Sequence, residues 1–114
     1  MDVLYQFLFH LVKLSKLVAS EVLENLEIAK LTDNDGWTLA HVAVVSHASI
    51  AIKSLKIPEI AKLENKYGRT VAHVAIISHC QVARKVLKSP DTFGKIMDNS
   101  GRSLLQLAAD KISK

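Results

Sequence analysis

Two stretches of the chain are almost wholly apolar, and a polar turn containing a glycine precedes each of them. They cover residues 39–45 and 71–77. A helix that is apolar on nearly all sides is buried on nearly all sides, so each stretch predicts a helix enclosed between neighbouring elements. Thr38 and Thr70 stand directly before the two stretches and are residue types that cap the first turn of a helix.

An amphipathic segment follows each apolar stretch and predicts a second, outer helix. These segments cover residues 49–56 and 81–88, where aliphatic side chains recur at helical spacing between lysines and an arginine. Pro58 and Pro90 are expected to end the two helices, because the residue before a proline is pushed out of the helical conformation.

The unit formed by a turn, an inner helix and an outer helix repeats along the chain. Gly36, Gly68 and Gly101 mark three turns that fall 32 and then 33 residues apart, and a positive φ is expected at each. Helices over residues 2–14 and 15–26 fit as a terminal unit that lacks the turn. The sequence therefore predicts a single all-α domain, 1–114, made of a capping helix pair (1–31), two repeats (32–63 and 64–96) and a truncated capping repeat (97–114).

The composition agrees with a folded chain, since 49% of residues are hydrophobic and 23% are charged. Cys80 is the only cysteine, so an internal disulfide is impossible and a reducing, cytoplasmic location is expected. Asp2 stands before the N-terminal apolar run, where a signal peptide would carry positive charge, and the run is too short to span a bilayer. No membrane association is expected.

The turn and the start of the inner helix share a spaced pattern of an acidic or amide residue, glycine, threonine, histidine and alanine. With its period near 33 residues, the pattern resembles the ankyrin repeat. The resemblance covers about residues 26–108 and implies a short ankyrin-like solenoid of stacked helix pairs, whose turns and inner helices bind partners. The residues that carry it are Asp33, Gly36, Thr38, His41 and Ala43, and then Asn65, Gly68, Thr70, His73 and Ala75.

Two features depart from the ankyrin pattern. The proline that starts the inner helix is replaced by Leu39 and Val71, and the glycine between the two helices is replaced by His47 and His79. These differences indicate a divergent form of the repeat, and they leave open whether its β-fingers are present or shortened.

The resemblance implies a partner-binding surface along the turns and the exposed side of the inner helices. On the inner helices, Val45 and Ile77 are unusually apolar for that side, which fits a dry groove, an oligomer contact or cover from another part of the chain. Trp37 either contacts a partner or packs over its own turn. The matching turn positions are Asn34, Asp35 and Trp37, then Lys66, Tyr67 and Arg69, and then Asn99, Ser100 and Arg102.

The histidines raise the question of a metal site, but their spacing argues against one. His41 and His47 are six residues apart on a helix and so face different directions; His73 and His79 repeat that spacing. By the resemblance, His41 and His73 hydrogen-bond the turn backbone and the threonine hydroxyl. His47 and His79 are expected to act at helix junctions, and Cys80 to be a small apolar residue. No metal or cofactor is expected.

The sequence carries no catalytic constellation, so an enzyme or enzyme subunit is the least favoured alternative. The leading prediction is a non-enzymatic module that binds another protein. Nucleic-acid binding is the second alternative, because the formal net charge is +4. A homodimer through Val45 and Ile77 is a further option for so short an array.

Overall fold

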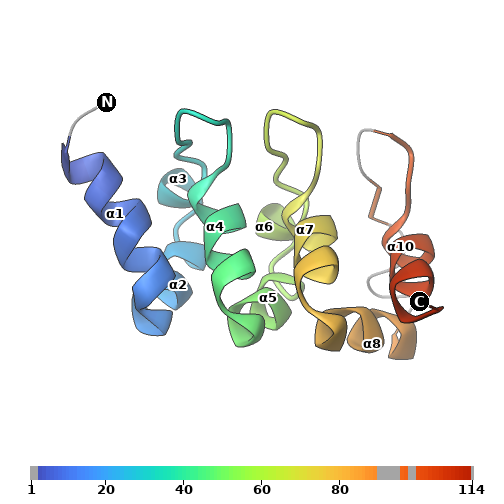
Figure 1. Ribbon diagram of the computed structural model, residues 1–114. Helices are drawn as coiled ribbons and strands as arrows, with labels where there is room; N and C mark the ends of the chain where they lie inside the picture. Colours follow the sequence, from blue (N-terminus) through green and yellow to red (C-terminus); the bar gives the residue numbers. More distant parts are fainter. Residues whose placement is uncertain (1–2, 90–95, 98–99, 114) are drawn as a thin grey trace.

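Helices follow one another in pairs over most of the described chain, and a single helix follows the last pair (Figure 1). The computed structural model describes residues 3–89, 96–97 and 100–113. Within these ranges the protein has nine helices and no strand, which confirms that it is all-α. Over the same ranges, none of the helices has both the length and the apolar character needed to cross a membrane.

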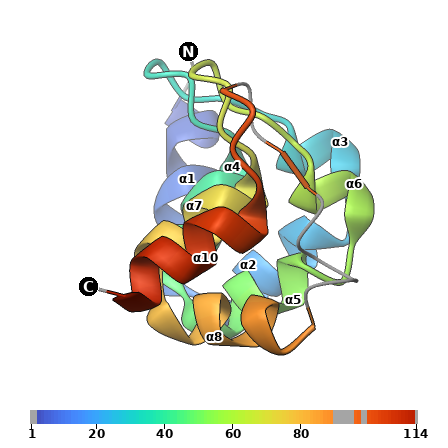
Figure 2. The ribbon, with the colours of Figure 1, turned by 90° about the vertical axis from the view of Figure 1, so that its right-hand side faces the viewer.

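Four inner helices stack side by side in one layer (Figures 1 and 2). Each of them packs against the next along the chain. They are α1 (Val3–Leu14), α4 (Leu39–Ser46), α7 (Val71–Ser78) and α10 (Leu104–Ser113).

Three outer helices form a second layer. An inner helix also packs against the outer helix of the preceding pair, as α4 does on α2 and α7 does on α5. Two short helices, α3 (Leu26–Ala29) and α6 (Pro58–Ala61), lead from this layer back toward the next turn. The outer helices are α2 (Lys16–Leu23), α5 (Ala48–Ser54) and α8 (Cys80–Lys88).

The two short helices were not predicted, and they correct the expected ends of the outer helices. Helix α2 ends at Leu23 rather than at residue 26, because Asn25 breaks the run and its Oδ1 accepts the amide of Ile28 to cap α3. Pro58 does stand beyond the end of α5, but it also opens α6 at the first helical position, where its missing N–H is harmless.

The remaining helix limits differ from the predictions by a few residues. Helix α5 runs from Ala48 to Ser54 rather than over 49–56, and α8 begins at Cys80, one residue early. Ser15 is not in a helix but caps α2 through a hydrogen bond from the amide of Val18. Asp2 and Pro90 lie outside the described residues.

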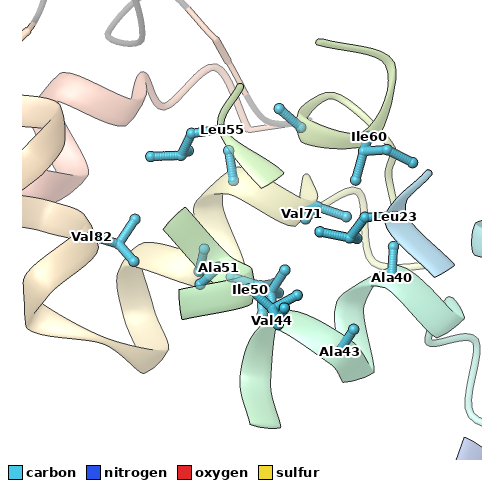
Figure 3. Close-up of a cluster of buried hydrophobic side chains, with 14 of the residues drawn as sticks. Leu23, Ala40, Ala43, Val44, Ile50, Ala51, Leu55, Ile60, Val71 and Val82 are labelled. Carbon is cyan, nitrogen blue, oxygen red and sulfur yellow. The ribbon is translucent and has the colours of Figure 1, made fainter. Parts of the chain in front are cut away.

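The core consists of aliphatic side chains from all these helices (Figure 3). As predicted, the inner helices α4 and α7 are buried on most sides. Ala40 and Ala43 are small enough to let neighbouring helices approach, and larger residues such as Leu23 and Ile60 fill the space between pairs.

The turns are short hairpins, which answers the question that the sequence left open about fingers. The first finger (residues 32–38) is closed by a bridge between Thr32 and Thr38, and the second finger (64–70) by a bridge between Glu64 and Thr70. A bridge between Met97 and Ser103 closes a third finger (97–103). The three turn glycines have φ near +80°, as expected.

Successive helix pairs are also joined by hydrogen bonds at the helix junctions. His47, between α4 and α5, donates from Nε2 to the carbonyl of Val12 at 2.9 Å. His79, between α7 and α8, makes the same bond to the carbonyl of Val44 at 2.8 Å. The predicted junction role of both histidines is confirmed, and it gives a physical reason for a histidine at each junction.

Candidate functional site

A buried histidine at the base of each of the first two fingers holds the next finger in place. The ring Nε2 of His41 lies 2.9 Å from the backbone carbonyl of Arg69, and its Nδ1 lies 2.6 Å from the hydroxyl of Thr38. A carbonyl only accepts, so Nε2 carries the proton and Nδ1 accepts from the threonine. His73 repeats this arrangement with Thr70 and the carbonyl of Arg102.

These contacts confirm the structural role predicted for His41 and His73. Both ring nitrogens of each histidine bond protein atoms, so neither ring is arranged as a metal ligand. Burial lowers the pKa of His41 from 6.5 to about 4, although its bond to the Arg69 carbonyl acts in the opposite direction. His41 is therefore neutral at physiological pH.

The first finger is held rigid from within. The Oδ1 atom of Asp33 accepts the amides of Asp35 and Trp37 at 2.9 and 3.0 Å, which fixes the turn around Gly36. The indole of Trp37 is half-buried and packs edge-on to the ring of His41, with their centroids 5.8 Å apart. Trp37 thus packs on its own unit and stays partly accessible, while its contact with a partner remains a prediction.

A hollow opens between this finger, α1 and α4. Trp37 and Val45 line one part of it, which has a volume of about 240 Å³. The other lining residues of this part are Lys13, Asp33, Val42 and Ser46. A second part of about 240 Å³ shares Lys13, Asp33 and Val42 and extends past the finger tip. Its remaining lining residues are Gln6, Phe9, Asn34 and Asp35.

The inner helices contribute exposed apolar side chains on the same side. Val45 is 45% exposed and Ile77, one repeat later, is 39% exposed, although almost all other positions of α4 and α7 are buried or half-buried. Lys111 from α10 donates to the carbonyl of Ile77 at 2.7 Å and so lies beside it. The structure therefore shows Val45 facing a hollow, while Ile77 lies next to a cation.

The second finger presents larger side chains than the first. Tyr67 is 56% exposed, and the Nζ of Lys66 lies 5.3 Å from the centre of its ring. The Tyr67 ring also lies 6.4 Å from the indole of Trp37. Arg69 is exposed. The structure thus brings Trp37, Lys66 and Tyr67 together across two fingers.

The third finger is described only in part. Ser100 and Arg102 are exposed, whereas Asn99 lies outside the described residues. The position of Arg102 follows the same register as Trp37 and Arg69, and its carbonyl is the one that His73 binds.

Several residues of the hollow were missed by reasoning from the sequence. Lys13, Asp33 and Val42 all line both parts of it. The 32-residue offset between the repeats places Lys13 at the position of Val45, so extending the repeat register to α1 would have brought it to attention. Asp33 was assigned to the turn alone, because its position in the sequence does not show that it also faces α1.

Cys80 differs from its predicted role. It is exposed at the first position of α8 rather than packed as a small apolar residue, because the start of this helix lies at the surface. Across the described part of the chain, no group of three or more histidine, cysteine or acidic side chains is placed to hold a metal ion.

The chain matches no protein-family model, no curated protein and no solved structure in the comparisons made. Its function is therefore argued from the residues and the geometry given above.

Proposed function

We propose that the protein is a non-catalytic protein-binding module built from ankyrin-like repeats. The observation that carries the proposal is the hollow beneath the first finger, where Trp37 and Val45 are accessible among polar residues. A partly apolar hollow with a few polar groups at its margin is the form that interaction sites commonly take.

The repeat architecture supports the ankyrin-like part of the proposal. Each of the two full repeats has a glycine turn, a Thr-x-x-His pair at the start of the inner helix and an outer helix that follows it. The buried histidine binds the backbone of the next finger, so neighbouring fingers are held in a row. A row of rigid turns beside apolar inner-helix positions presents a continuous surface to one partner.

Two features favour a protein partner over a nucleic acid. The carboxylates of Asp33 and Asp35 border the hollow and would repel a phosphate backbone. Trp and Tyr side chains, which are enriched at the energetic centres of protein interfaces, stand together at Trp37 and Tyr67.

The test is affinity capture of partners from a cell extract, comparing the wild-type chain with a Trp37→Ala/Arg69→Ala variant. We expect the variant to lose the proteins that the wild-type chain enriches, while circular dichroism shows the same helical content. Lys56→Ala, an exposed change outside the finger surface, serves as the matched control and should retain them. Equal capture by the double variant would overturn the proposed surface.

A further inference from the structure

The charge of the finger row changes sign between the first and the second finger. The first finger carries Asp33 and Asp35 and no basic residue. The second finger carries Lys66 and Arg69 against Glu64. Asp35, Lys66 and Arg69 are all exposed, so the change of sign lies on the surface that a partner would meet.

The hollow beside the first finger combines this negative charge with an apolar floor. Its apolar lining residues are Phe9, Val42, Trp37 and Val45, the carboxylates of Asp33 and Asp35 border it on the finger side, and Lys13 of α1 also lines it. The residue of α1 that corresponds in register to His41 is the apolar Phe9. The hollow thus lies between the first finger, α1 and α4, with Phe9 on its α1 side where the later units have a histidine.

The two fingers are directly joined, so their charges have a fixed relation. The amide of Lys66 donates to the carbonyl of Gly36 at 3.1 Å, which links the second finger to the tip of the first. Tyr67 and Trp37 face one another across the same junction. A partner that covers both fingers therefore meets negative charge, an aromatic pair and positive charge in that order.

We infer that the hollow binds a polypeptide segment in which a lysine or arginine adjoins an apolar side chain and an acidic residue follows at a short distance. The cation faces Asp33 and Asp35, the apolar side chain enters the hollow against Trp37 and Val45, and the carboxylate faces Lys66 and Arg69. This inference rests on the proposed function and gives its partner a chemical description.

The spacing of the two charges follows from the packing of the helices. Packed helices lie about 8–10 Å apart, and neighbouring fingers continue directly into neighbouring inner helices. An extended chain rises about 3.3 Å per residue. The acidic residue should therefore stand roughly three residues from the cation.

The chain offers its own readout for the test, because Trp37 is its only tryptophan and lines the hollow. Short random peptides displayed on phage are selected against the full chain, and the enriched peptides are synthesised and titrated while Trp37 emission is followed. We expect the enriched peptides to share the basic, apolar and acidic order at this spacing and to change the emission of Trp37.

Charge reversal then tests whether the cation of the peptide contacts Asp35. Asp35→Lys should weaken the selected peptides about five- to tenfold, since an exposed attraction becomes a repulsion. A peptide whose cation is replaced by glutamate should regain affinity for that variant. Glu59→Lys makes the same change of charge on the exposed part of α6 and should leave the affinity unchanged.

The outcomes separate this inference from the proposed function. Two results overturn the inference alone, provided that protein capture still depends on Trp37 and Arg69. In one, the enriched peptides share no charge order; in the other, they bind the Asp35→Lys variant as well as the wild-type chain. If neither protein capture nor peptide selection succeeds, the inference and the proposed function are both overturned. A change of Trp37 emission with a single-stranded oligonucleotide, in place of peptides, would assign the hollow to nucleic acid.

Discussion

At the scale of single residues, His41 shows how the fold depends on a neutral side chain. Its proton is fixed on Nε2 by the Arg69 carbonyl, and its Nδ1 accepts from Thr38. A second proton on Nδ1 would require the Thr38 hydroxyl to turn and accept, which gives up the bond that it now donates. The ring is fully buried, so the charged form would also lose its solvation.

This arrangement predicts a loss of stability in acid. The folded pKa of His41, about 4, lies below the unfolded value of 6.5, so the unfolded chain binds the proton first as the pH falls. The contribution of neutral His41 to the free energy of unfolding is complete above pH 6.5 and is lost as the pH falls toward 4. It amounts to roughly 3 kcal/mol. Urea unfolding at pH 7 and at pH 4.5 measures it. A His41→Gln variant should be less stable at pH 7 but show a smaller difference between the two pH values.

Gly36 and Gly101 show two physical reasons for a glycine in a turn, a positive φ and the lack of space for a Cβ. Both have φ near +80°, a conformation that is strained for any residue with a side chain. A Cβ on Gly36 would in addition overlap the side chain of Lys66, whereas a Cβ on Gly101 would meet nothing within 4 Å. Gly101→Ala should therefore cost about 1–2 kcal/mol of unfolding free energy, and Gly36→Ala more. Equal costs, measured by urea denaturation, would show that Lys66 moves aside freely.

The contacts within a unit could be predicted from the sequence, and those between units could not. Thr38 and His41 are three residues apart at a helix start, so their pairing is a local consequence of the helix. The position of Trp37 depends on Tyr67 and on α1, which only the packing of separate units brings near it.

At the scale of elements, the short helices α3 and α6 hold equivalent positions in successive units. Ile60 of α6 is 1% exposed, in a helix that packs on α3, α5 and α7, whereas Ile28 of α3 is 37% exposed. Neither helix was predicted, since four residues are too few to show a helical period and the caps Asn25 and Ile57 carry little signal alone.

The two isoleucines offer a matched comparison. Ile60→Ala should lower the unfolding free energy by about 2–5 kcal/mol, as for other buried isoleucines. Ile28→Ala should lower it by less than about 1 kcal/mol. Chemical denaturation of both variants measures the difference. A large loss at Ile28 would mean that its surface is covered in solution.

At the scale of the whole molecule, the candidate site combines side chains of two successive units, since α1, the first finger and α4 all line it. The repeat period predicted the stacked pairs correctly because each unit carries the same local signals. A dry groove at Val45 was one reading of the sequence, but the contribution of α1 to the hollow, through Phe9 and Lys13, was not predicted. Such a feature belongs to the array rather than to any single motif.

The histidine links between pairs have a consequence for the order in which the array opens. His47 and His79 each fix a preceding inner helix, at Val12 and at Val44. At the corresponding position α10 carries the apolar Ile112, and the exposed Lys111 donates from α10 to the Ile77 carbonyl at 2.7 Å.

Local opening should therefore start at α10 and travel toward α1. In native-state hydrogen exchange, the amides of α10 are expected to exchange first and those of α4 and α7 last. His79→Ala should make the amides of α4 exchange faster. Ser78→Ala, at the neighbouring exposed position, should leave their exchange unchanged. The same rates in both variants would mean that apolar packing alone sets the order.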